Sequence, residues 1–118
     1  MKYMVLLVGD GPQKPWPTMT PEEQGAAMAR FGEFDAACTA HPEVSVVSGE
    51  ALDGPDTATV VRTGADGTTT LTEGPYAEVL EGLGGFYVVE APDLDTLVEL
   101  LRLLPPYDME IRPVVEYE

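Results

Sequence analysis

Two short apolar runs constrain the fold more strongly than any other feature of this sequence. Residues 3–8 and 86–91 are mostly apolar, and each run is too short to form a helix of its own. A strand whose side chains are apolar in both alternating directions is typical of the middle of a sheet. We therefore expect two central strands, one near each end of the chain.

Each predicted central strand is followed by a predicted amphipathic helix. The first helix begins at Thr20, which can form a capping box with Glu23, and it ends before Pro42. The second begins at Asp93 and ends before Pro105. The apolar sides of these helices comprise Ala27, Phe31, Phe34 and Cys38 in the first, and Leu94, Leu97, Val98, Leu101 and Leu104 in the second.

The remaining segments predict further strands and one hairpin. Strands are expected at residues 44–52 and 109–117, and Pro113 indicates that the second of these lies at an edge. The hairpin is expected from threonine-rich arms at 58–63 and 68–73, joined by the turn Gly64 to Gly67. Residues 74–85 are expected to form a loop with a helical turn near 77–83.

The order of these elements predicts an α+β fold. Without the hairpin it reads βαββαβ, the ferredoxin-like pattern, so we expect that fold with an inserted β-hairpin in a single domain, residues 1–118. Both helices then lie on one face of the sheet. The other face is apolar and uncovered, which predicts a homodimer.

Charge and cysteine content exclude several functions. Six Lys and Arg residues against 21 Asp and Glu residues give a net charge of -15, which opposes binding to nucleic acids and to anionic membranes. Cys38 is the one cysteine, so an intramolecular disulfide or a cysteine cluster for a metal is impossible. We expect no metal and no cofactor. We also expect a cytoplasmic location, because the first apolar run is too short for a signal or a membrane span.

The most distinctive stretch runs from Thr72 to Glu81 and is followed by Leu83-Gly84-Gly85-Phe86-Tyr87. It resembles the DGPF-type branch of the YciI-like (YCII-related) family, whose signature is DGPFAETKE followed by a Gly-Gly-aromatic strand. The resemblance extends over nearly the whole chain and implies a ferredoxin-like domain that dimerises as an α+β barrel. Here Glu73 and Tyr76 replace the Asp and Phe of the signature, and Leu80 stands where the signature has its lysine.

Six residues are candidates for a ligand-binding site. Glu73, Glu78 and Glu81 form either a carboxylate cluster in a pocket or a solvated acidic loop. Arg62 and Arg112, both in predicted strands, either hold a substrate carboxylate or form internal salt bridges. Tyr76 would provide an apolar wall.

Two classes of function fit these residues. In the first, the dimer binds a small organic molecule in a cleft beside the Glu73–Glu81 loop. In the second, the domain is a non-catalytic regulatory or protein-interaction module, because relatives of the DGPF type are often encoded beside sigma factors. No nucleotide-binding, P-loop, zinc-protease or serine-hydrolase motif is present, so the residues name no reaction and no catalytic group.

Overall fold

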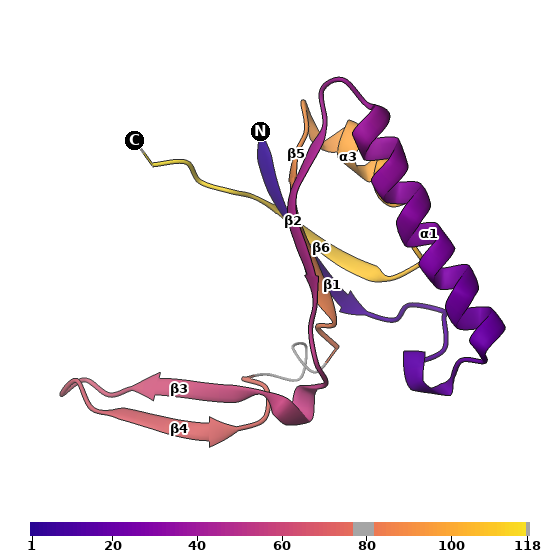
Figure 1. Ribbon diagram of the computed structural model, residues 1–118. Helices are drawn as coiled ribbons and strands as arrows, with labels where there is room; N and C mark the ends of the chain where they lie inside the picture. Colours follow the sequence, from indigo (N-terminus) through magenta and orange to yellow (C-terminus); the bar gives the residue numbers. More distant parts are fainter. Residues whose placement is uncertain (77–81, 118) are drawn as a thin grey trace.

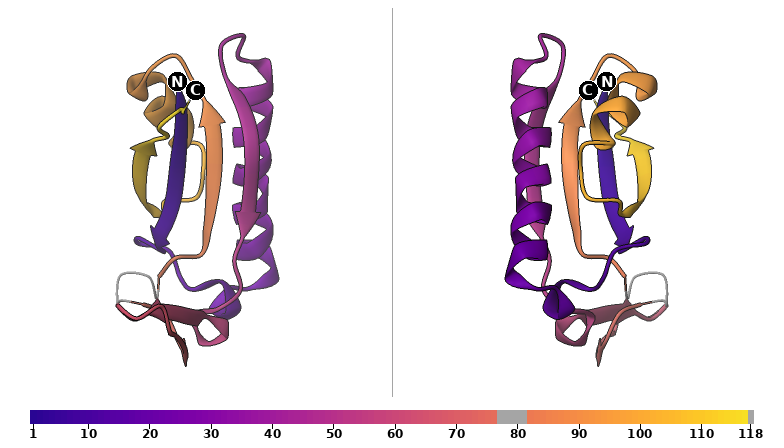
Figure 2. Two further views of the ribbon diagram at one scale, coloured as in Figure 1. Left: turned by 90° about the vertical axis from the view of Figure 1, so that its left-hand side faces the viewer. Right: turned by 90° about the vertical axis from the view of Figure 1, so that its right-hand side faces the viewer.

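The computed structural model describes residues 1–76 and 82–117, and its main element is one antiparallel sheet. The strands of this sheet are β1 (Lys2–Gly9), β2 (Ser45–Ala51), β5 (Gly85–Glu90) and β6 (Asp108–Pro113), in the order β2-β5-β1-β6. Two helices, α1 (Pro21–Ala40) and α3 (Leu94–Leu101), cover one face of the sheet (Figure 1, Figure 2). This α+β arrangement is compatible with the ferredoxin-like pattern expected from the sequence.

The predicted capping box opens α1. The backbone N–H of Glu23 donates to Thr20 Oγ1 at 3.1 Å, and the N–H of Thr20 donates to Glu23 Oε1 at 3.0 Å. The backbone bond from Thr20, with a further bond from Lys14, lowers the pKa of the Glu23 carboxyl. The helix ends at Ala40, and the N–H of His41 closes its last turn, as the sequence predicted.

Alternation along the central strands separates the core from the opposite face. In β1, Tyr3, Val5 and Leu7 are buried under the helices, whereas the residues between them are only partly buried. The expectation of two central strands is confirmed, because β5 and β1 occupy the two inner positions of the sheet. The largest fully buried side chains are Phe34, Leu97, Leu104, Val5, Val89, Pro105 and Cys38.

The second helix is shorter than the sequence predicted, and only part of its apolar side is buried. Leu97, Leu101 and Leu104 are buried, but Leu94 and Val98 are 48% and 36% exposed. The helix has eight residues and buries only the part of its apolar side that faces the sheet, which leaves these two residues more exposed.

Arg30 fastens the turn that follows α3. Its Nε donates to the carbonyl oxygen of Leu103 at 3.1 Å, and its terminal nitrogen donates to the carbonyl of Arg102 at 2.9 Å. Carbonyls just past a helix end lack partners within the helix, and Arg30 provides one from α1. This contact joins the two helices.

A β-hairpin stands apart from the main sheet. Its strands β3 (Thr59–Thr63) and β4 (Thr69–Glu73) form a separate two-stranded sheet, and we call residues 59–73 the arm. At its tip the N–H of Gly64 donates to the carbonyl of Thr68 at 2.7 Å, and Gly67 takes the positive φ of 85° that the turn requires. At its base the N–H of Gly74 donates to the carbonyl of Ala58 at 2.9 Å, just after the 3-10 turn η2 (Pro55–Thr57).

The arm gives the chain an extended shape. It leaves the main sheet on the side opposite the helices (Figure 1), and the described residues span 50 × 46 × 18 Å. Their radius of gyration is 16.5 Å, against about 13.5 Å for a compact chain of this length. No other described helix or strand packs extensively on β3 or β4.

The closing strand is shorter than the sequence predicted. β6 ends at Pro113, and residues 114–117 leave the sheet after one more bond, from the N–H of Val114 to the carbonyl of Lys2 at 2.8 Å. β6 lies at the edge of the sheet, as Pro113 indicated. The predicted helical turn near 77–83 falls mostly outside the described residues.

Candidate functional site

A cavity of about 520 Å³ lies at the base of the arm. Its walls come from the segment before β3, from β3 itself and from the chain that leaves β4. The lining residues are Leu52, Asp53, Gly54, Pro55, Thr57, Ala58, Thr59, Val60, Val61, Pro75, Tyr76 and Leu83. Among the described residues, most of this lining is apolar or small, and Asp53 is its one charged member.

Local hydrogen bonds fix the wall made by η2. The hydroxyl of Thr57 donates to the carbonyl of Gly54 at 2.6 Å, and the N–H of Gly54 donates to Asp53 Oδ1 at 2.7 Å. The N–H of Thr57 adds a second bond to Gly54 at 3.0 Å. The turn is therefore held by its own short-range bonds, which gives the cavity one rigid side.

Arg62 and Tyr76, two of the residues singled out from the sequence, are in contact at the rim. The guanidinium carbon of Arg62 lies 4.7 Å from the centre of the Tyr76 ring, which also lines the cavity. Such a contact stabilises an exposed pair by about 0.5–1 kcal/mol. Arg62 is not itself a lining residue; alternation along β3 places it on the same side of the arm as Val60, and residues from both sides of β3 line the cavity.

Arg112 lies elsewhere. It belongs to β6, at the edge of the main sheet, and its Nε donates to Glu110 Oε2 at 2.8 Å. It is not among the residues that line the cavity. Arg112 thus forms an exposed salt bridge with Glu110, and its role in ligand binding stays a prediction of the sequence.

The three candidate glutamates are only partly placed. Glu73 is the exposed last residue of β4 and pairs with Thr59, which lines the cavity. Glu78 and Glu81 lie outside the described residues. A carboxylate cluster beside the cavity thus stays a prediction of the sequence.

Sequence reasoning missed most of the residues before β3. Leu52 to Thr57 form much of the cavity, although the sequence indicated only a turn there. The signal that could have found them is the pair of Gly-Pro steps, Gly54-Pro55 and Gly74-Pro75, that flank the hairpin. Because hairpin strands are antiparallel, the two ends of the hairpin must lie side by side.

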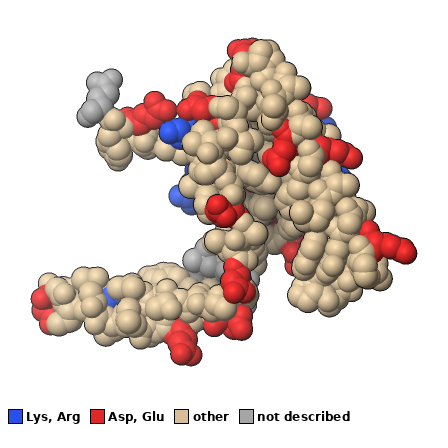
Figure 3. Space-filling view, in the orientation of Figure 1, with Lys and Arg blue, Asp and Glu red and all other residues tan. Residues whose placement is uncertain are grey.

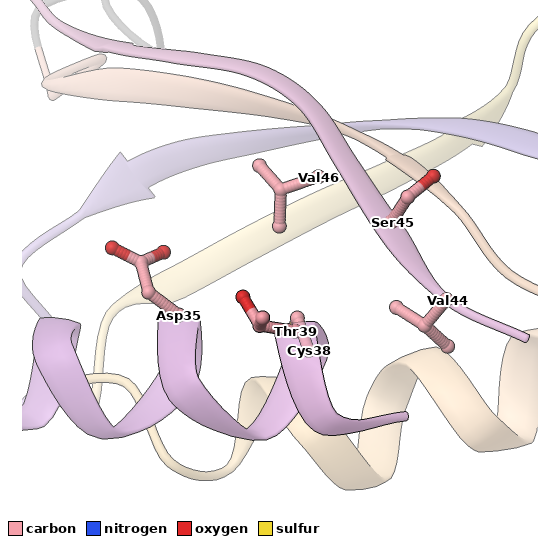
Figure 4. A pocket seen from close by; sticks show the side chains of 6 residues that line it. All are labelled: Asp35, Cys38, Thr39, Val44, Ser45 and Val46. Carbon is pink, nitrogen blue, oxygen red and sulfur yellow. The ribbon is translucent and has the colours of Figure 1, made fainter. Parts of the chain in front are cut away.

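A second cavity, of about 440 Å³, lies between α1 and β2 (Figure 4). Asp35 and Thr39 extend oxygen atoms from the helix into this gap, and Cys38 lies beside them. Burial, and then the charge of Asp35, raise the pKa of the Cys38 thiol, so the thiol stays protonated and is a weak nucleophile. The negative charge of Asp35 in its wall makes this cavity a poor match for an anionic guest.

Tyr87 packs close to this second cavity but offers no acid–base chemistry near neutral pH. Its ring lies 5.1 Å from that of Phe34, centre to centre. Burial, with a smaller effect of Asp35, raises the pKa of its hydroxyl to about 12. The cavity at the base of the arm is the better candidate site, because one of its lining residues, Tyr76, is in contact with the guanidinium of Arg62.

Within residues 1–76 and 82–117, no group of three or more His, Cys, Asp and Glu side chains is arranged to hold a metal ion. No helix in this part of the chain is long and apolar enough to cross a membrane.

Fold and cavity together define a small α+β domain with a hollow at the base of a projecting hairpin. The sequence matches the family model of the YCII-related domain over residues 1–118, and the chain belongs to that family. A comparison with curated proteins finds no match.

Proposed function

We propose that this YCII-related domain binds a small organic anion, with an apolar body and one carboxylate, in the cavity at the base of the arm. The observation that carries this proposal is the Arg62–Tyr76 contact at the rim. An arginine there presents a planar fork of N–H donors that matches a carboxylate. The Tyr76 ring and Val60 would contact the apolar body of the ligand.

The size and lining of the cavity support a small-molecule ligand. Its volume of about 520 Å³ lies within the range of about 300–1,000 Å³ that is usual for such sites. Apolar walls with few polar groups are also usual, because burial of apolar surface provides affinity and the polar groups provide orientation. Arg62 would give the site a preference for anions in an otherwise acidic protein.

Benzoate is a suitable probe, and benzyl alcohol is its uncharged match. We expect benzoate to shift the amide resonances of Thr57 to Val61 and of Leu83 in a saturable NMR titration, and benzyl alcohol to shift them much less. Arg62→Met should remove the preference for benzoate. Arg102→Met, at an exposed arginine that pairs with Glu99 on α3, should leave it unchanged. Equal shifts by both probes, or full benzoate binding by Arg62→Met, would contradict the proposal.

Arg112→Met separates the two arginines that the sequence left as alternatives. Because Arg112 pairs with Glu110 on the main sheet, we expect its removal to leave benzoate binding intact. Loss of binding in Arg112→Met, with retention in Arg62→Met, would move the site away from the arm.

We also propose that the domain is a homodimer, built from a ferredoxin-like unit with the hairpin as an insertion and closed into an α+β barrel. The half-buried apolar side chains on the helix-free face of the sheet support this assembly. The stretch Glu73-Gly74-Pro75-Tyr76 supports a place in the DGPF-type branch of the family. A cytoplasmic location is part of the same proposal, supported by the single free cysteine.

The regulatory module stays a prediction of the sequence. On the face that Figure 3 shows, the acidic side chains are spread over several elements. The proposal covers ligand binding alone, because the residues name no reaction and no catalytic group.

A further inference from the structure

The helix-free face of the main sheet, here called the open face, is apolar at its centre. Met4 and Leu6 of β1 pair with Val88 and Phe86 of β5, and all four alternate with residues that pack into the core. Their side chains are partly buried by their neighbours in the sheet. Neither of the two described α-helices covers this face, as the left view of Figure 2 shows.

The open face alone is small for a stable interface. Four strands about 4.8 Å apart, each with about six residues at about 3.3 Å, make a flat area of about 400 Å². Specific protein–protein interfaces bury about 800 Å² on each partner. A partner that covers the open face must therefore contact more of this chain than the sheet.

The arm offers the additional apolar surface. Val61 and Leu71 lie directly opposite each other in β3 and β4, and they are 60% and 69% exposed. Alternation places them on the side of the arm away from Arg62, and Val61 also lines the cavity at the base of the arm. A two-stranded hairpin is marginal on its own in water, and nothing else in the described chain packs extensively on it.

Charge at the border of the open face favours a second copy of the chain over a strongly charged partner. Lys2 and Arg112 lie on this face together with Glu50, Glu90 and Glu110. A border of mixed sign can complement itself across a two-fold axis. It also brings two of the six cations of an acidic chain to the place where two copies would meet.

We propose that the arm of each protomer extends over its partner, packs its Val61–Leu71 side against that second copy, and so holds the two open faces together. The cavity at the base of the arm then borders the interface, and assembly of the dimer steadies its walls. This inference rests on the proposed homodimer and adds the arm as the element that holds it.

Sedimentation equilibrium tests the role of the arm. The double variant Val61→Thr, Leu71→Thr keeps β-forming side chains but removes the apolar pair. We expect it to raise the Kd of the dimer about tenfold or more, because two apolar contacts are lost from each protomer. Met28→Thr, at an exposed methionine of α1, should not change the Kd.

The outcomes separate the arm from the dimer itself. A wild-type dimer whose Kd is unchanged in the double variant would overturn the arm proposal and leave the homodimer standing. A wild-type monomer at micromolar concentration would overturn both. Circular dichroism on the same samples shows whether the variant retains its folded core.

A spin label provides a test that does not depend on a destabilised variant. Ala65→Cys places a nitroxide at the exposed arm tip, and buried Cys38 should not react. The nitroxide-labelled variant, without ¹⁵N, is mixed with ¹⁵N-labelled wild type. The NMR spectrum then shows only effects of the nitroxide on the partner protomer. We expect line broadening in the partner's main sheet. A dimer without such broadening, or with broadening confined to α1, would overturn the proposal.

Discussion

Arg62 lies over the ring of Tyr76, with its guanidinium carbon 4.7 Å from the ring centre. The two residues come from opposite sides of the hairpin, Arg62 from β3 and Tyr76 from the chain just after β4. Antiparallel pairing and the turn at Gly74, with its φ of 88°, bring them together. A scarce cation is thereby held beside an apolar wall.

Arg62→Lys tests whether the shape of this cation matters in addition to its charge. Lysine keeps the positive charge but lacks the planar fork that binds both oxygens of a carboxylate. We expect the affinity for benzoate to fall about three- to tenfold, a smaller loss than in Arg62→Met. The Kd from an NMR titration measures this difference, and an unchanged Kd would show that charge alone acts there.

Gly49→Ala should destabilise the fold. A Cβ at this position would lie 2.7 Å from Cδ1 of Tyr87, whose ring packs against Phe34 and has little room to move. We expect a loss of about 1–3 kcal/mol in the free energy of unfolding, measured with urea.

Gly32→Ala is the matched control for Gly49→Ala. A Cβ at Gly32, within α1, meets nothing within 4 Å. We expect this variant to gain about 0.5–1 kcal/mol, because alanine favours a helix over glycine. Equal effects at the two glycines would contradict the packing described for Tyr87.

Acid should weaken the fold by protonating carboxylates that accept hydrogen bonds at the helix starts and in the turn of the arm. Hydrogen bonds lower the pKa values of Glu23, Asp66 and Asp93 below their ordinary values of 4.5, 3.8 and 3.8, mainly from Thr20, Thr68 and Thr96 respectively. Groups with a lowered folded pKa stabilise the protein above their unfolded pKa, and this stability is lost as the pH falls through the folded value. Unfolding free energy should therefore decline from about pH 5 to pH 3.

Glu23→Gln separates the capping effect from the loss of negative charge in general. It should flatten the pH dependence, whereas Glu22→Gln, which removes the same charge one residue earlier, should preserve it. The same slope in both variants would contradict the role assigned to the capping box.

Salt should stabilise the protein at pH 7. The net charge of -15 makes the folded chain repel itself, and ions screen that repulsion. We expect Tm to rise when sodium chloride is added from low to moderate concentration. An unchanged Tm would mean that the carboxylates are much better paired than six cations suggest.

Local chemistry made much of the fold predictable. The Thr20–Glu23 pattern identified the start of α1 because the capping box depends on adjacent residues. The two short apolar runs identified the central strands β1 and β5, because a strand in the middle of a sheet is apolar in both directions. The exposure of Leu94 and Val98 could not be read from the apolar pattern, because the buried width of a helix depends on what lies against it.

The candidate site was predictable only in part. Tyr76 and Arg62 were singled out from residue type, and the structure brings them together. Arg112 was grouped with them because it is an arginine in a predicted strand. In the structure it lies in β6, at the edge of the main sheet, where it pairs with Glu110.

A crystal structure of the protein grown with benzoate tests the central claim most directly. The account predicts a ring in the cavity against Tyr76, with the carboxylate about 2.8 Å from the nitrogens of Arg62. A cavity filled by protein side chains, with Arg62 bound to a carboxylate of its own chain, would contradict it.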